Sequence, residues 1–146
     1  FWLAEKYNND VEKSFNMIYF EHGGLYGGDL DAFAIKFNPL DVKLPEFEII
    51  DNRFEYLDNI SSLPAFVSPT LYHLTENIQG EEDNFDDFLD VNNIYELFEA
   101  TALTEINQLF KKANEEKIFG NLNFKKPFYF AVGEHDAGAP KLIYVI

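Results

Sequence analysis

Residues 128–146 read FYFAVGEHDAGAPKLIYVI, two apolar runs separated by a short polar segment. The runs 128–132 and 141–146 have the length and the aromatic and β-branched content of strands. The segment GEHDAG between them contains two glycines and two carboxylates, residue types that are typical of turns. This stretch therefore predicts a β-hairpin, and with it a fold that contains an antiparallel sheet.

A second hairpin is predicted near the other end of the chain. The apolar runs 17–20 and 32–37 are joined by HGGLYGGDLD, whose four glycines supply the positive φ angles that turns require. Residues 39–69 differ, because four prolines divide them into short pieces such as FEII at 47–50. We expect short strands to alternate with loops in that part of the chain.

The longest helix is predicted between residues 93 and 117. Apolar residues recur there at helical spacing: Ile94, Leu97, Phe98, Ala102, Ile106, Leu109, Phe110 and Ala113. Asn93, followed three residues later by Glu96, resembles a capping box, and Gly120 lies just beyond the expected end near Lys117. We expect this helix to bury Leu97, Ile106, Leu109 and Phe110.

Two further helices complete the predicted fold. The opening segment FWLAEKYNNDVEKSF has apolar residues four positions apart, which is typical of an amphipathic helix, and residues 70–78 predict a short helix. We therefore expect a single globular α+β domain over residues 1–146. In it, an antiparallel sheet of four to six strands includes both hairpins, and the N-terminal helix and the long helix pack on one face.

The composition narrows the classes of function. The 26 acidic and 11 basic residues give a net charge of −15, which repels nucleic acid and anionic lipid and attracts a basic protein. No apolar run approaches the ~20 residues of a membrane span. The absence of cysteine excludes a disulfide, a thiolate metal site and a cysteine nucleophile. We expect a cytoplasmic protein with no cofactor and with neither nucleic acid nor a membrane as partner.

The densest acidic segment is GEEDNFDDFLD, residues 80–90. Its phenylalanines occupy positions where a calcium-binding loop needs an oxygen ligand or a glycine, so the segment does not match such a loop. Two interpretations stay open: a solvated acidic surface that confers solubility, and a contact surface for a basic partner. The candidate partner-binding residues are Glu81, Glu82, Asp83, Asp86, Asp87 and Asp90.

Each predicted hairpin also carries a histidine beside carboxylates. Glu21 and His22 follow the first strand of one hairpin, and Glu134, His135 and Asp136 lie in the turn of the other. If both tips lay at one edge of a single sheet, His22, His135 and Asp136 would be candidate ligands of a divalent metal in a hydrolase. Polar residues are also what hairpin turns normally contain, and we favour that interpretation. The chain lacks the G-x-S-x-G, G-x-x-x-x-G-K and H-E-x-x-H motifs, so enzyme activity is left open.

Several segments resemble bacterial protein families. The long helix, the segment NEEKIFG after it, the strand FYFAV running into EHD, and the earlier AFAIKFNP resemble an uncharacterised family of small bacterial α+β domains. A broader resemblance is to the Smi/Knr group, the SUKH superfamily of cell-wall-synthesis regulators and toxin-immunity proteins. The resemblance implies a non-catalytic module that binds another protein, and it transfers no catalytic residues. An immunity protein that occludes a basic toxin also fits the acidic charge.

Overall fold

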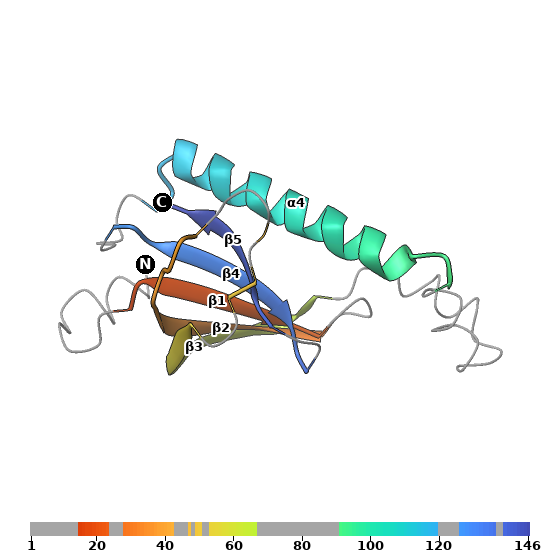
Figure 1. Cartoon of the computed structure of the whole chain (residues 1–146), viewed down its shortest axis with the longest axis horizontal. Coiled ribbons are helices and arrows are strands. Elements are labelled where there is room, and N and C mark those ends of the chain that lie inside the picture. Colours follow the sequence, from red (N-terminus) through yellow and green to blue (C-terminus); the bar gives the residue numbers. More distant parts are fainter. Residues whose placement is uncertain are drawn as a thin grey trace.

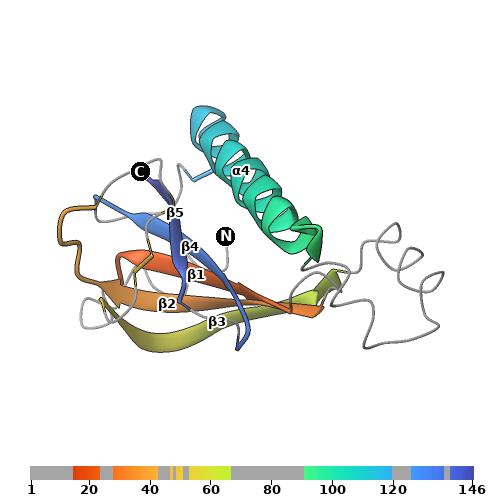
Figure 2. The ribbon, with the colours of Figure 1, turned by 45° about the vertical axis from the view of Figure 1, so that its right-hand side comes forward.

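The computed structural model describes residues 15–23, 28–42, 47, 49–50, 53–66, 91–119, 126–136 and 139–146. The elements in these residues are β1 (Met17–His22), β2 (Gly28–Phe37), β3 (Phe54–Phe66), α4 (Ile94–Glu115), β4 (Tyr129–Glu134) and β5 (Lys141–Val145). The strands form one five-stranded sheet, and α4 lies across one side of it, alongside β5 (Figures 1 and 2). The α+β class and the predicted number of strands are therefore confirmed.

The two predicted hairpins both form, and they join into the sheet through β1 and β4. The strand order is β3-β2-β1-β4-β5, with antiparallel pairing everywhere except between β1 and β4, which run parallel. The prediction of a purely antiparallel sheet is therefore wrong at its centre. Parallel strands need a long crossover connection, and here the chain between β1 and β4 includes β2, β3 and α4.

The largest departure from the expected strands is β3. It runs for 13 residues through a segment for which short pieces were expected, and it includes Pro64. The proline is accommodated because β3 is an edge strand and because the register with β2 shifts between Gly28 and Leu30, opposite the proline. The FEII segment forms no strand within the described residues, where Ile49 makes a single bridge to Lys141. The predicted N-terminal helix and the predicted helix at 70–78 lie outside the described residues.

The face of the sheet that α4 covers, hereafter the helix face, holds one half of the core. Its buried side chains include Ile18, Phe128, Phe130, Val132 and Ile143, with Leu103 of α4 packed among them. The Phe110 ring lies 4.5 Å from the Phe130 ring, centroid to centroid, and 6.1 Å from the Tyr144 ring. Burial of large aromatic rings of this kind is a main source of stability in a domain of this size.

The helix packs through a narrower stripe than the sequence indicates. Ile106 and Phe110 are half-buried against the core, as expected, but Leu97 and Leu109 are 68% and 64% exposed. At 100° per residue, Leu97 and Leu109 lie on opposite flanks of the stripe centred on Leu103. A single sheet below the helix covers only that stripe, so the expected burial of the two leucines is wrong.

The helix begins at Ile94, as the sequence indicates, but the predicted capping box does not form. Asn93 has φ 52° and makes no side-chain hydrogen bond to the helix, while its carbonyl oxygen accepts a hydrogen bond from the Leu97 amide, 3.1 Å. A capping side chain needs an extended backbone to reach the first free amides, and the left-handed backbone of Asn93 does not provide it. The helix ends at Glu115, close to the expected position, with Lys112 in its last turn.

The opposite face, hereafter the second face, holds the other half of the core. Its buried side chains are Met17, Tyr19, Ile35, Phe37, Ile50, Tyr129, Ala131 and Leu142. β1 contributes Ile18 to the helix face and Met17 and Tyr19 to the second face, because side chains alternate along a strand. This alternation decides which polar residues meet at the end of β1.

Candidate functional site

The ends of β1 and β4 meet at one edge of the sheet. The parallel pairing sets Glu21 beside Gly133 and His22 beside Glu134. The His135 amide then donates a hydrogen bond to the His22 carbonyl oxygen, 2.8 Å. The two tips that carry the histidines are therefore adjacent, although they come from opposite ends of the sequence.

The adjacent tips do not bring the two imidazoles together. His22 continues the alternation of Ile18 and Phe20, which places its side chain on the helix face. His135 instead contacts Glu21, which follows Tyr19 on the second face. Among the residues that the structure describes, no group of three or more His, Asp or Glu side chains is arranged to hold a metal ion. Metal binding by His22, His135 and Asp136 stays a prediction without support from this geometry.

His135 bridges two carboxylates on the second face. Its Nδ1 lies 3.3 Å from Oε1 of Glu21, and its Nε2 lies 3.3 Å from Oδ2 of Asp136. The hydrogen bond to Glu21, and then the charge of Asp136, raise the pKa of the imidazole above its usual value. The Glu21 side chain is only 19% exposed, whereas that of His135 is 68% exposed. Glu21 is thus held within the sheet, and His135 covers it from the solvent side.

A third carboxylate stands across the hairpin from Glu21. Asp31 on β2 pairs with Glu21 in the antiparallel register, so both side chains emerge on the second face. The charge of Asp31 also contributes to raising the pKa of His135. We call Glu21, Asp31, His135 and Asp136 the tip cluster. With three carboxylates and one imidazole, the tip cluster as a whole is negatively charged whether the histidine is neutral or protonated.

Next to the tip cluster, four aromatic rings form a continuous group on the second face. The aromatic cluster consists of Tyr19, Phe33, Phe54 and Tyr56. The Tyr56 ring is central, with centroid distances of 5.2 Å to Phe54, 5.5 Å to Phe33 and 6.0 Å to Tyr19. Tyr19 is buried, whereas Tyr56 is 52% exposed. The cluster therefore reaches from the core to the surface.

Glu21 connects the aromatic cluster to the tip cluster. Burial raises the pKa of both the Tyr19 and the Tyr56 phenol, and the nearby charge of Glu21 raises each of them further. The interaction between the two hydroxyls also raises the pKa of Tyr19. The arrangement is thus a half-exposed Tyr56 ring with the carboxylate of Glu21 nearby. It offers contact area and charge, and no described group in it is arranged as a nucleophile with a base.

The sequence-based site residues fall in two groups. Glu81, Glu82, Asp83, Asp86, Asp87 and Asp90 lie outside the described residues. His135 and Asp136 belong to the tip cluster, and His22 lies beside it on the helix face. Sequence reasoning missed Tyr56 and Asp31, and the signal that would find Tyr56 is the alternation of Phe54 and Tyr56, typical of a strand with one buried side.

Comparison of the chain with protein-family models, with curated proteins and with solved structures found no match. No helix in the described part of the chain has both the length and the apolar character needed to cross a membrane. The site has therefore to be interpreted from its own chemistry.

Proposed function

We propose that this protein is a non-catalytic module that binds a basic protein partner through the aromatic cluster, with the tip cluster as its charged border. The observation that carries the proposal is the half-exposed Tyr56 ring beside Glu21. Tyrosine and other aromatic residues are enriched at protein interfaces, and they supply much of the binding energy where they fill a pocket of the partner.

The charge of the chain supports a basic partner over a neutral or acidic one. With a net charge of −15, the protein attracts cationic surfaces at long range, which raises the rate of encounter. At the site itself, the partner's Lys or Arg would lie over the Tyr56 ring and pair with Glu21 or Asp31. The acidic segment 80–90 would extend the same attraction to other parts of the partner.

A narrower form of the proposal is a bacterial immunity or regulatory protein that occludes a basic toxin or nuclease in the cytoplasm. It rests on the acidic charge and on the sequence resemblance to the Smi/Knr group. In this form the partner's own active site would be the basic surface that the protein covers.

The experiment is affinity capture from the source cells with three baits: the wild-type protein, Tyr56→Ala and Glu21→Gln. A basic protein retained at low salt and released at about 0.5 M salt is expected with the wild type, because salt screens the attraction. The captured protein is then purified, and its Kd is measured for each bait. Tyr56→Ala should weaken binding about thirtyfold, as expected for a central aromatic contact worth about 2 kcal/mol.

Two variants on α4 provide matched controls. Leu109→Ala removes an apolar side chain that is at least as exposed as that of Tyr56, and Glu105→Gln removes one exposed carboxylate. Both should bind the partner with the wild-type Kd. Capture of neutral or acidic partners with salt-independent affinity, or equal Kd values for the wild type and Tyr56→Ala, would contradict the proposal.

A further inference from the structure

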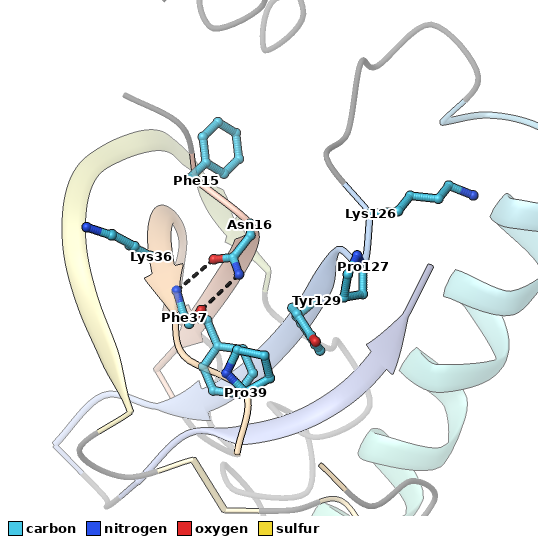
Figure 3. A pocket seen from close by; sticks show the side chains of 8 residues that line it. All are labelled: Phe15, Asn16, Lys36, Phe37, Pro39, Lys126, Pro127 and Tyr129. Carbon is cyan, nitrogen blue, oxygen red and sulfur yellow. Dashed lines mark hydrogen bonds between the residues drawn. The ribbon is translucent and has the colours of Figure 1, made fainter. Parts of the chain in front are cut away.

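A pocket of about 270 Å³ lies at the start of β1, at the other end of the strand from the tip cluster. Its apolar walls include the rings of Phe15, Phe37 and Tyr129 (Figure 3). The Phe37 and Tyr129 rings meet edge to face, with centroids 4.8 Å apart. Both residues are buried, so this wall is fixed by the packing of the second face.

Asn16 holds the pocket together. Its backbone carbonyl oxygen accepts a hydrogen bond from the Tyr129 amide, 2.9 Å. Its side chain makes both hydrogen bonds with the backbone of Phe37, at 2.7 and 2.8 Å (Figure 3). The two aromatic walls are thus attached to one residue, and the pocket is formed in advance of any ligand.

Two lysines stand at this pocket in a chain that is strongly acidic. Lys36 and Lys126 line it, and no carboxylate is present among the described residues that do so. Neither lysine forms an ion pair within the described part of the chain, whereas Lys112 pairs with Glu116 and Lys141 with Glu99. In Figure 3 the two lysines extend from opposite sides of the pocket, with their ammonium groups directed away from its centre. Each has a flexible four-carbon stem, and the proposal below requires rotation about these bonds to bring the charge over the opening.

We propose that this pocket binds a small anion with an aromatic body, such as an aryl carboxylate. The volume of about 270 Å³ is below the usual range of drug-sized sites and too small for a peptide. The ring of the ligand would lie against Phe37 and Tyr129, and its carboxylate would pair with Lys36 and Lys126 at the opening. The pocket shares no lining residue with the proposed protein interface, although Phe37 in its wall pairs with Phe54 of the aromatic cluster in the register of β2 with β3.

The test uses the wild-type protein with sodium benzoate as the probe and benzamide as its neutral analogue of nearly the same shape. Two-dimensional amide NMR follows Phe37 and Tyr129, whose amides hydrogen-bond to Asn16. Benzoate should cause saturable shifts at both amides, and benzamide should bind about tenfold more weakly, because it lacks the charge that the lysines recognise. Absence of saturable shifts with benzoate, or equal affinity for the two probes, would overturn the proposal.

Two double variants with the same change in net charge test whether benzoate binds at this pocket. Lys36→Gln with Lys126→Gln removes the two cations at the opening and should weaken benzoate binding about tenfold or more. Lys111→Gln with Lys112→Gln makes the same charge change on exposed positions of α4 and should leave the affinity unchanged. All four lysines are exposed, and within the described residues the Lys112 side chain forms only the ion pair with Glu116 described above. Neither pair of substitutions is therefore expected to alter the fold. Equal weakening by both pairs would mean that benzoate responds only to net charge, and the proposal would be wrong.

Discussion

The side chain of Asn16 makes with the backbone of Phe37 the two hydrogen bonds that a neighbouring strand would otherwise make. The Asn16 Oδ1 accepts from the Phe37 amide at 2.7 Å, and the Asn16 Nδ2 donates to the Phe37 carbonyl oxygen at 2.8 Å. Phe37 is the last residue of β2, and β1 begins one residue after Asn16. The side-chain amide of Asn16 therefore uses one donor and one acceptor to extend the hydrogen bonding of the sheet beyond the residues at which β1 pairs with β2.

Asn16→Asp should destabilise the protein by about 1–3 kcal/mol, because it removes the donor to the Phe37 carbonyl and sets a carboxylate oxygen against it. Urea denaturation near neutral pH measures the loss. Gln108→Ala, at an exposed position of α4, serves as the control and should change the free energy of unfolding by less than about 0.5 kcal/mol. A similar small change for Asn16→Asp would show that the hydrogen bond from Asn16 Nδ2 to the Phe37 carbonyl oxygen contributes nothing net.

Gly133→Ala should also be destabilising, for a steric reason. A Cβ at this position would lie 2.8 Å from the Tyr19 Oη, 3.2 Å from its Cε2 and 3.4 Å from the Pro140 Cα. Tyr19 is buried, so its ring has little room to move. The expected cost is about 1–3 kcal/mol in chemical denaturation.

A double-mutant cycle tests whether that cost comes from the Tyr19 hydroxyl. In the background of Tyr19→Phe, the closest contact is gone, so Gly133→Ala should cost measurably less than in the wild type. Strictly additive free energies in the four proteins would place the strain elsewhere, at the ring carbon of residue 19 or at Pro140.

The titration of His135 should depend on Glu21. Because the folded protein raises the pKa of His135, the pair contributes stability below about 6.5, the usual histidine value, and that contribution is lost as the pH rises through the folded-state pKa. NMR titration of the imidazole should show a lower pKa in Glu21→Gln than in the wild type. Glu105→Gln on α4 should leave the pKa of His135 where it was, and an unchanged pKa in both variants would exclude the Glu21 contact in solution.

Phe110→Ala should be the most damaging change on α4. The ring packs against Phe20, Phe130 and Tyr144, and its removal is expected to cost about 3 kcal/mol. Leu109→Ala, at the adjacent exposed position, should cost less than about 0.5 kcal/mol. Comparable losses for the two variants in urea denaturation would mean that α4 lies on the sheet in a different rotation.

Zinc titration tests the predicted metal site directly. Since the His22 and His135 side chains emerge on opposite faces, they do not share one ion, and His135→Ala should leave any weak zinc affinity of the protein unchanged. Calorimetry of the two proteins at one pH makes the comparison. A clear loss of affinity in His135→Ala would restore His135 as a ligand.

The sequence predicts local structure well in this protein because local structure depends on local patterns. Both hairpins and the start of the long helix follow from apolar runs, glycines and helical spacing within a few residues of one another. The exposure of Leu97 and Leu109 is not predictable in this way. An apolar stripe on a helix does not indicate how much of the helix surface the neighbouring sheet will cover.

The tip cluster was only half predictable for the same reason. His135 and Asp136 attract notice as neighbours in a turn, but their contact with Glu21 depends on which strand pairs with β4 and in which direction. A shift of one residue in that register would send Glu21 to the other face. Charge and residue type therefore suggest the members of a site, and the pairing between distant strands selects among them.

The parallel junction of β1 with β4 also has a consequence during synthesis. The meander of β1, β2 and β3 is contiguous in sequence and is complete long before β4 leaves the ribosome, so until then the second edge of β1 has no strand beside it. An apolar strand with an open edge is a template for pairing with another nascent chain. Fragments that end before β4 should therefore aggregate more readily than the full chain.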